Sequence, residues 1–282
     1  MDKILIIGSK GQLGRELMVS APDGIDIVGL DKEELDITVE SDVFSCIGKI
    51  APSVIVNCSA YTDVEQAELD PDAAFRVNCI GVMNLARVCK EMGIWLIHIS
   101  TDYVFDGKKK GTPYLESDYV NPVNSYGRSK LAGELVIQSY LSNFTIIRTS
   151  GLYSRWGARG KGSNFPLKIM SLAKEKGVVK VVNDVITSPT YASDLSEFIW
   201  NNILRERKTG LLHVVNSGSV SWYDFACYLL SCSRIDARVI PVSSNEFPTR
   251  AKRPGWSVLA SEKGVVLRPW KDAVKRFLEV LG

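Results

Sequence analysis

Tyr126 and Lys130 are the two residues whose types and spacing most directly suggest chemistry. On a helix, side chains four positions apart share one face. An ammonium beside a phenol favours the phenolate, so we expect Lys130 to lower the pKa of Tyr126 and to suit it for proton transfer. A Tyr and a Lys fall at this spacing by chance in many chains. The pair is therefore evidence for a catalytic role only if it also lies at the right place in the fold.

Thr101 directly follows an apolar run at residues 95–100, which by its length and composition is predicted to be a strand. Ligands of doubly wound α/β sheets bind beyond the carboxyl ends of the strands. We therefore expect Thr101 to hydrogen-bond a substrate carbonyl oxygen alongside Tyr126. Taken singly, Thr101 could equally be a strand-end hydroxyl that is satisfied within the fold.

Glycines at positions 8, 11 and 14 lie between a predicted strand at 3–7 and a predicted helix at 11–20. Glycine lets the backbone turn sharply and approach a pyrophosphate closely, and the N-terminus of the following helix offers N–H donors and a partial positive charge. The strand–turn–helix context is the one that a dinucleotide-binding turn requires. The expected contacts include Gly8, Gly11 and Gly14.

The end of the second predicted strand, at 25–30, bears on which dinucleotide binds. Asp31 can accept hydrogen bonds from an adenosine ribose, which favours NAD, whereas the neighbouring Lys32 suits the 2′-phosphate of NADP. The sequence leaves both open. Asp36 and Ile37 are expected to flank the adenine, with a turn or helix-capping role as the alternative for Asp36.

Strands and helices alternate through the first half of the chain. Further strands are predicted at 54–57, 95–100 and 145–148, and further helices at 39–50, 71–92 and 131–140. This alternation predicts an α/β fold with a doubly wound, parallel, Rossmann-type sheet and right-handed crossovers. The string Asn-Pro-Val-Asn-Ser at 121–125 is a candidate helix start directly before Tyr126. Such a sheet would bring the strand end at Thr101 close to the helix that carries Tyr126.

The alternation breaks near residue 150. A loop is predicted at 151–164, then helices and strands at 165–176, 178–182, 191–205, 212–216, 221–231 and 270–281. We expect residues 1–150 to form an NAD(P)-binding Rossmann domain to which 187–217 returns. Residues 151–186 and 218–282 would then form a smaller, interleaved substrate-binding lobe.

Composition excludes several classes of protein. The 34 Lys and Arg balance 32 Asp and Glu, which gives a net charge of +2 and no basic surface for nucleic acid. No apolar run approaches the roughly 20 residues that span a bilayer, and none resembles a signal peptide. Six scattered cysteines and two histidines favour a reducing cytoplasm and predict neither a disulfide framework nor a metal site.

Longer strings narrow the interpretation. The chain reads Asn-Cys-Ser-Ala-Tyr-Thr-Asp-Val-Glu at 57–65, Ser-Thr-Asp-Tyr-Val-Phe at 100–105, Arg-Thr-Ser at 148–150 and Ala-Lys-Arg-Pro-Gly-Trp-Ser-Val-Leu at 251–259. With the glycine turn and the Tyr126–Lys130 pair, these strings resemble dTDP-4-dehydrorhamnose reductases, which are extended short-chain dehydrogenases/reductases. The resemblance runs from residue 1 to the last predicted helix.

The resemblance implies an NAD(P)H-dependent oxidoreductase that reduces the C4 ketone of a nucleotide-linked 6-deoxy-4-ketohexose, as in the conversion of dTDP-4-dehydro-L-rhamnose to dTDP-L-rhamnose for polysaccharide biosynthesis. By similarity, Tyr126 donates the proton, Lys130 tunes Tyr126 and holds the nicotinamide ribose, and Thr101 orients the carbonyl. Similarity also implies cofactor contacts from Gly11, Gln12, Leu13, Ala60, Tyr61 and Thr62. The residues expected to border the sugar are Thr62, Val64, Thr101, Asp102, Tyr103 and Arg253.

Two departures from the family pattern fall in the substrate half. Gly151 stands where relatives carry a tryptophan, and the string at 184–190 lacks a usual Gln and Gly. Trp156 is a candidate replacement for that tryptophan. The alternatives to a reductase are a nucleotide-sugar epimerase on the same fold and a non-catalytic, reductase-like regulatory subunit. A monomer or a homodimer is expected.

Overall fold

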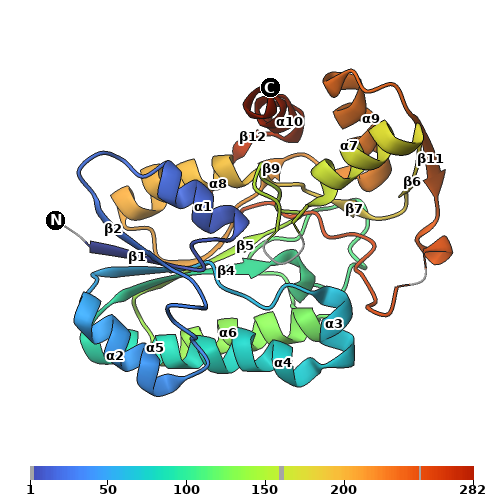
Figure 1. Cartoon of the computed structure of the whole chain (residues 1–282). Helices are drawn as coiled ribbons and strands as arrows, with labels where there is room; N and C mark the ends of the chain where they lie inside the picture. Colours follow the sequence, from blue (N-terminus) through green and yellow to red (C-terminus); the bar gives the residue numbers. More distant parts are fainter. Residues whose placement is uncertain (1–2, 159–161, 248) are drawn as a thin grey trace.

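A parallel β-sheet forms the centre of the computed structural model, which describes residues 3–158, 162–247 and 249–282. Within these residues the sheet has six strands in the order β2-β1-β3-β4-β5-β8 (Figure 1). Every neighbouring pair is parallel. This confirms the predicted doubly wound sheet. The strands are β1 (Lys3–Ile7), β2 (Asp26–Leu30), β3 (Val54–Asn57), β4 (Trp95–Thr101), β5 (Phe144–Thr149) and β8 (Gly210–His213).

Helices cover both faces of this sheet (Figure 1). One face carries α2 (Glu40–Ile50), α5 (Val82–Met92) and α6 (Ser125–Tyr140), and the other carries α1 (Gln12–Val19) and α8 (Ala192–Phe198). Successive side chains of a strand point to opposite faces. Burial of both faces explains why the strands are continuous apolar runs in the sequence.

The core accordingly has two halves. Leu5 and Ile7 of β1 join the buried cluster under α2, α5 and α6, whereas Ile4 and Ile6 join the cluster under α1 and α8. None of these four side chains is more than 3% exposed. The first strand is thus sealed on both sides, and its carboxyl end is held at a fixed place.

The helix predicted at 71–92 is interrupted. It consists of α4 (Pro71–Phe75), a π-helical turn η1 (Arg76–Gly81) and α5. A second π-helical turn, η3 (Ile199–Leu204), follows α8 within the helix predicted at 191–205. A π-helical turn accommodates an extra residue, which apolar periodicity alone does not reveal.

Capping side chains explain two helix starts that periodicity missed. α6 begins at Ser125 rather than at 131, because the Asn124 side chain accepts a hydrogen bond from Gly127 N at 2.7 Å. The short helix α3 (Val64–Leu69) begins after Asp63, whose carboxylate accepts from two backbone N–H groups. The earlier start of α6 places both Tyr126 and Lys130 on it.

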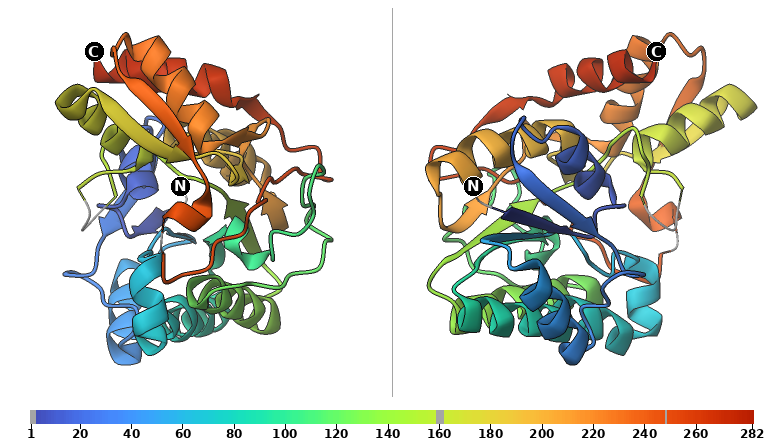
Figure 2. Two further views of the ribbon diagram at one scale, coloured as in Figure 1. Left: turned by 90° about the vertical axis from the view of Figure 1, so that its right-hand side faces the viewer. Right: turned by 60° about the vertical axis from the view of Figure 1, so that its left-hand side comes forward.

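Apart from α8, η3 and β8, most of the second half of the chain forms a smaller assembly above the sheet (Figure 2). Tyr153, Phe225, Trp270 and Phe277 belong to its separate buried cluster. The elements around this cluster are α7 (Phe165–Lys176), β6 (Val178–Val182), α9 (Trp222–Ser233), β11 (Arg238–Val242) and α10 (Trp270–Leu281), with β6 and β11 paired in parallel.

Short strands connect this assembly to the sheet. The strand predicted at 212–216 divides into β8 and β9 (Asn216–Ser217), and β9 pairs with β12 (Leu267–Pro269). β7 (Ile186–Thr187) pairs with β10 (Val220–Ser221) in antiparallel fashion. The remaining short elements are the 3-10 turns η2 (Asp102–Val104) and η4 (Ser244–Glu246). In the part of the chain that the structure describes, no helix combines the length and the apolar character needed to cross a membrane.

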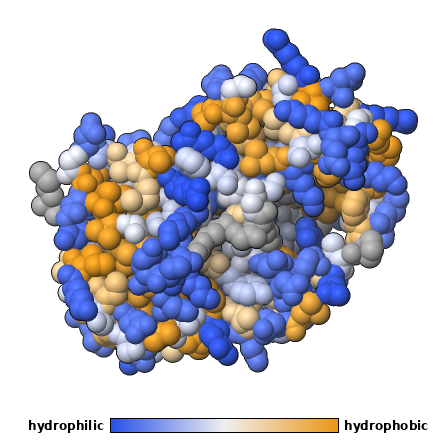
Figure 3. Space-filling model, in the orientation of Figure 1, coloured by the Kyte–Doolittle hydropathy of each residue, from blue (hydrophilic) through white to orange (hydrophobic). Residues whose placement is uncertain are grey.

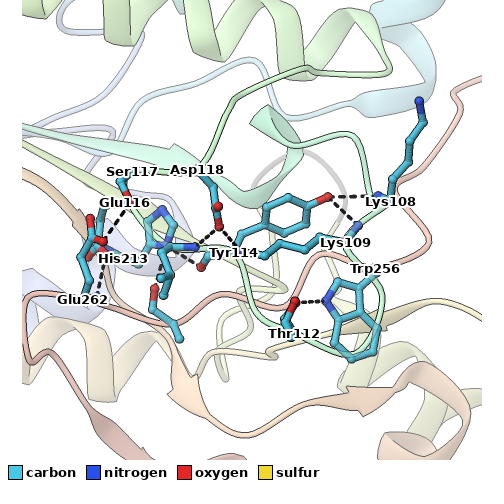
Figure 4. A network of polar contacts seen from close by, with 12 residues as sticks. Lys108, Lys109, Thr112, Tyr114, Glu116, Ser117, Asp118, His213, Trp256 and Glu262 are labelled. Carbon is cyan, nitrogen blue, oxygen red and sulfur yellow. Dashed lines mark hydrogen bonds and ion pairs between the residues drawn. The ribbon is translucent and has the colours of Figure 1, made fainter.

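Two loops, residues 112–118 and 256–262, form a clamp over the end of β8 (Figure 4). The buried carboxylate of Glu116 accepts hydrogen bonds from His213 N, Ser261 Oγ and Glu262 N at 2.6–2.9 Å. His213 Nδ1 lies 3.1 Å from the Tyr114 carbonyl oxygen and 2.9 Å from that of Ala260. The clamp therefore holds residues 256–262 to the central sheet.

We expect substitution by alanine to change the free energy of unfolding in opposite directions at two helical glycines. A Cβ at Gly133 of α6 would lie 2.3 Å from the Asn78 carbonyl oxygen, whereas one at Gly48 of α2 would lie 3.5 Å from Met92 Cε. Gly133→Ala should therefore lower the free energy of unfolding by about 1–3 kcal/mol through overpacking. Gly48→Ala should raise it by about 0.5–1 kcal/mol. Urea unfolding of the two variants measures both effects, and equal effects would show that α6 does not depend on this close approach.

Candidate active site

A cleft of about 1110 Å³ lies at the carboxyl ends of the central strands. In Figure 3 the surface is hollowed between the sheet layer and the assembly above it. The cleft brings together every residue predicted to contact a cofactor, namely Gly8, Gly11, Gln12, Leu13, Gly14, Asp31, Asp36, Ile37, Ala60, Tyr61, Thr62, Tyr126 and Lys130. It is also lined by Val64, Thr101, Asp102 and Tyr103.

A side chain would not fit at Gly8 or Gly14 of the glycine turn. Gly8 has φ +80°, and a Cβ on it would lie 2.7 Å from Ser59 N. A Cβ on Gly14 would lie 2.2 Å from the Gly8 carbonyl oxygen. The turn leads directly into α1, which begins at Gln12. A tight backbone cradle at a helix N-terminus fits a pyrophosphate, so the residues present suit a dinucleotide.

The side chain of Gln12 faces the loop after β5. Its Nε2 donates to the Leu152 carbonyl oxygen at 3.2 Å, and its Oε1 accepts from Ser154 Oγ at 3.2 Å and from Asn164 Nδ2 at 2.8 Å. Gln12 therefore offers a bound anion its backbone N–H, while its amide ties the turn to Leu152, Ser154 and Asn164.

Asp31 lines the cleft and also accepts hydrogen bonds from the backbone of the turn. Its two oxygens accept hydrogen bonds from Lys10 N at 2.9 Å and Lys32 N at 2.7 Å, and the residue is 2% exposed. Asp36 accepts from Thr38 N and Oγ1, which is the turn role that the sequence left open for it. Lys32 lines the cleft beside both.

Tyr126 is the second residue of α6 and lies next to Thr101, the last residue of β4. Burial raises the pKa of Tyr126, and a hydrogen bond with the Thr101 hydroxyl opposes this rise. We expected Lys130 to lower this pKa, but burial outweighs any such effect. The phenol therefore keeps its proton at neutral pH, which suits a proton donor.

Lys130 is 1% exposed, and its ammonium group lies against the end of β4. Its Nζ donates to the Ile99 carbonyl oxygen at 2.7 Å and lies 3.2 Å from His98 Nε2. Burial lowers the pKa of Lys130 to about 8, although the Glu134 carboxylate acts in the opposite direction. Lys130 is thus able to change charge near physiological pH.

A buried ion pair fixes α6 against the sheet. Arg148 of β5 donates from Nε and Nη2 to the two oxygens of Glu134, with Nη2 and Oε2 2.6 Å apart, and Ser100 Oγ also donates to Glu134. Glu134 is 0% and Arg148 3% exposed. The sequence analysis did not identify Glu134, although it lies one turn after Lys130, on the same helix face. Removing one partner of such a pair leaves an uncompensated buried charge.

Asp102 lines the cleft among hydroxyl groups. It forms hydrogen bonds with Ser257, Ser150 and Thr101, while burial raises its pKa to about 6. Burial also raises the pKa of Tyr103 to about 12. These hydroxyls come from β4, the end of β5 and the clamp, so this wall is assembled from distant parts of the chain.

Arg253 does not line the cleft. Its Nη2 lies 3.0 Å from Glu65 Oε1, and Glu65 Oε2 accepts from Arg250 N at 2.8 Å. The ion pair holds the segment before the clamp against α3, near Tyr103. A residue predicted to border the sugar therefore lies at the rim, because a nearby carboxylate pairs with its guanidinium.

The predicted replacement of the missing tryptophan is wrong. Trp156 is not among the residues that line the cleft, and its ring packs under the guanidinium of Arg155 at 4.3 Å. A Cβ on Gly151 would instead lie 3.1 Å from the ring of Trp222. Trp222 of α9 packs against Phe165 with ring centroids 4.4 Å apart, and both Phe165 and Gly151 line the cleft. Trp222 lies 71 positions after Gly151 in the sequence, so proximity along the chain gave no signal.

Further lining residues that the sequence did not reveal lie at the start of the interrupted helix, at the end of β5, in the loop after it and at the start of α7. They are Asp70, Ala73, Arg76, Val77, Thr149, Ser150, Leu152, Ala158, Ser163, Asn164 and Phe165. The available signal for the first group was the place of this helix in the sequence, after the strand β3 whose carboxyl end borders the cleft. Across residues 3–158, 162–247 and 249–282, no cluster of three His, Cys, Asp or Glu side chains could hold a metal ion.

The raised pKa of Asp102 predicts a pH-dependent stability. The folded state holds this proton more tightly than the unfolded chain, so the stabilisation is complete below pH 3.8 and is lost as the pH rises through about 6. Asp102→Asn stays neutral, so relative to the wild type it should gain about 2.4 kcal/mol of unfolding free energy between about pH 4 and about pH 8.

Urea unfolding at both pH values measures this difference. Asp23→Asn, at an exposed carboxyl, is the matched control and should show no comparable change. A stability difference between Asp102→Asn and the wild type that does not vary with pH would contradict the burial of an ionisable group there.

Comparison with known proteins agrees with this geometry. The family model of the RmlD substrate binding domain matches residues 1–282. The spore coat polysaccharide biosynthesis protein SpsK of Bacillus subtilis is 37% identical over 99% of this chain and 98% of its own length. The dTDP-4-dehydrorhamnose reductase of Sinorhizobium fredii is 37% identical over 99% of this chain and 97% of its own length.

A solved structure is equally similar. The dTDP-4-dehydrorhamnose reductase of Bacillus anthracis, in complex with NADP, superimposes with a TM-score of 0.94 at 37% sequence identity, over 99% of each chain. Sequence, fold and cleft point to the same group of proteins. The chain belongs to the dTDP-4-dehydrorhamnose reductase family.

Proposed function

We propose that this protein is an NAD(P)H-dependent oxidoreductase that reduces the C4 ketone of dTDP-4-dehydro-L-rhamnose to give dTDP-L-rhamnose. The observation that carries the proposal is the meeting of Thr101, Tyr126 and Lys130 in one cleft with the glycine turn. The names of the relatives, and the NADP bound to one of them, support the same reaction. Reduction of a sugar nucleotide also fits a relative named for polysaccharide biosynthesis.

The proposed roles follow from what each side chain touches. A bound reduced nicotinamide would supply the hydride. Tyr126, which holds its proton at neutral pH, donates that proton to the carbonyl oxygen, and the Thr101 hydroxyl beside it orients the same oxygen. Lys130 holds the nicotinamide ribose and carries charge behind the reacting groups. The backbone N–H groups of the glycine turn bind the pyrophosphate.

We also propose that different parts of the chain bind the two ligands. Residues 1–150 with 187–217 bind the dinucleotide, and residues 151–186 with 218–282 bind the sugar nucleotide. Thr62, Val64, Asp102 and Tyr103 contact the sugar nucleotide inside the cleft, and Arg253 acts at its rim. The six free cysteines support action in the cytoplasm. We propose that the protein acts as a monomer or a homodimer.

Tyr126→Phe tests the proton donor. Loss of the hydroxyl should lower kcat by about 10²–10⁴-fold, because general acid catalysis is removed, while the binding of NADPH stays close to that of the wild type. Turnover is followed as loss of nicotinamide absorbance with dTDP-4-dehydro-L-rhamnose, and cofactor binding by fluorescence titration.

Tyr119→Phe is the matched control, since Tyr119 is 84% exposed and does not line the cleft. Full activity of Tyr126→Phe would remove Tyr126 as proton donor. Absence of turnover by the wild type with this substrate, in the presence of either reduced cofactor, would overturn the proposed function.

We propose NADPH as the preferred cofactor. Asp31 is engaged with the backbone of Lys10 and Lys32, and the Lys32 ammonium stands beside the cleft where a 2′-phosphate would lie. Lys32→Ala should raise KM for NADPH about tenfold, the equivalent of one charge-assisted hydrogen bond of about 1.5 kcal/mol, and leave KM for NADH nearly unchanged. Steady-state kinetics with both cofactors, and Lys49→Ala as control, measure this. An equal rise for both cofactors would contradict a contact to the 2′-phosphate.

A further inference from the structure

His98 lies behind Lys130, on the side away from the cleft. It stands near the middle of β4, is 0% exposed and does not line the cleft. Its Nε2 is 3.2 Å from Lys130 Nζ, and its Nδ1 is 3.1 Å from Asn57 Nδ2 on the neighbouring strand β3. The parallel register pairs Asn57 with His98 directly. Of the residues that line the cleft, Lys130 is the one whose side chain His98 contacts directly.

The hydrogen bonds of Asn57 determine which nitrogen of His98 carries the proton. Ser59 directs its backbone N–H at Asn57 Oδ1 over 3.1 Å and its hydroxyl at the same oxygen over 2.5 Å. A backbone N–H can only donate, so Oδ1 must face Ser59, and Nδ2 must face His98. Because Nδ2 also donates, His98 Nδ1 is the acceptor, and in a neutral ring the proton lies on Nε2.

The neutral form of the ring follows from its surroundings. Burial, followed by the charge of Lys130, lowers the pKa of His98 well below its ordinary value. Nε2–H therefore points at Lys130 Nζ. An ammonium has no lone pair to receive it, whereas a neutral amine can accept from Nε2–H and donate to the Ile99 carbonyl oxygen. The contact favours the neutral amine.

Other ionisable groups face Lys130 from the elements around it. Burial lowers the pKa of Lys130 to about 8, and the negative forms of Glu134 on α6 and Cys58 after β3 act against this. Glu134 is itself paired with Arg148. Tyr126 lies one turn earlier on the same helix. The N–H of His98 therefore adds to the effect of burial and opposes that of Glu134.

We propose that Asn57 and His98 form a positioning pair that makes Lys130 a proton carrier instead of a permanently charged ammonium. The proposal rests on the proposed function, in which Tyr126 loses a proton to the substrate oxygen at each turnover. The Lys130 ammonium then returns a proton to the tyrosinate and becomes the amine that accepts from His98 Nε2–H. Lys130 regains its proton from solvent through the cleft, so protons balance over the cycle.

The tautomer can be measured without any substrate. The chain contains only two histidines. His213 Nδ1 lies between two carbonyl oxygens and must carry its proton there. In protein labelled with ¹⁵N-histidine, long-range ¹H–¹⁵N spectra should therefore show one Nδ1–H ring and one Nε2–H ring. Two Nδ1–H rings in the wild type would overturn the proposal.

Asn57→Asp tests the consequence for Lys130. The carboxylate keeps the contacts with Ser59 but cannot donate, so the proton of His98 should move to Nδ1 and leave Nε2 as an acceptor for the ammonium. The alkaline limb of the kcat–pH profile should then move up by about one pH unit or more, a tenfold change in the acidity of Lys130, with KM for the sugar nucleotide nearly unchanged. A switched tautomer without movement of that limb would overturn the proposal.

The added charge of Asn57→Asp needs its own control. The double variant Asn57→Asp/His98→Phe keeps the carboxylate and removes the ring, so a limb that moves as far as in the single variant would assign the shift to charge and contradict a role for the tautomer. His98→Phe alone should move the limb upward without any added charge. If the wild type fails to reduce the ketosugar, the proposed function fails, whereas the histidine spectra still decide the tautomer.

Discussion

The ion pair between Glu134 and Arg148 is the contact on which the geometry of the cleft depends. It joins the helix that carries Tyr126 and Lys130 to the strand beside β4, and both partners are almost completely buried. A buried pair of this kind contributes little net stability, but it strongly disfavours arrangements that separate its charges. The register of α6 against the sheet is fixed in this way, and the distance between Tyr126 and Thr101 is fixed with it.

Burial also sets the protonation of the groups around the cleft. The same loss of solvent keeps the proton on Tyr126, raises the pKa of Asp102 and lowers that of Lys130. An acid that stays protonated and an amine that can lose its proton stand on the same helix. In the proposed reaction, one fold thus supplies both a donor and a means of restoring that donor, without any metal among the proposed groups.

The sequence predicted local features well and distant contacts poorly. β1 and α7 have the predicted bounds, and the glycine turn, Thr101, Tyr126 and Lys130 meet as expected, because short motifs and strand order determine them. Contacts between residues far apart in the sequence could not be read from it. Glu65 pairs with Arg253 at the rim of the cleft, and Trp222, not Trp156, lies beside Gly151. The direction of a pKa shift was also hard to predict from the sequence, because burial raises the pKa of Tyr126, which we expected Lys130 to lower.

The π-helical turn η1 has a consequence for how this wall of the cleft can vary. One extra residue rotates the helix before it by about 100° relative to the helix after it. Ala73 and Arg76 line the cleft, Val77 both lines it and packs against the buried cluster under the sheet, and Leu85 and Val88 belong to that cluster. The ligand-facing positions Ala73 and Arg76 are therefore separate from the apolar stripe of α5, so they can diversify in evolution while that stripe keeps the helix packed under the sheet.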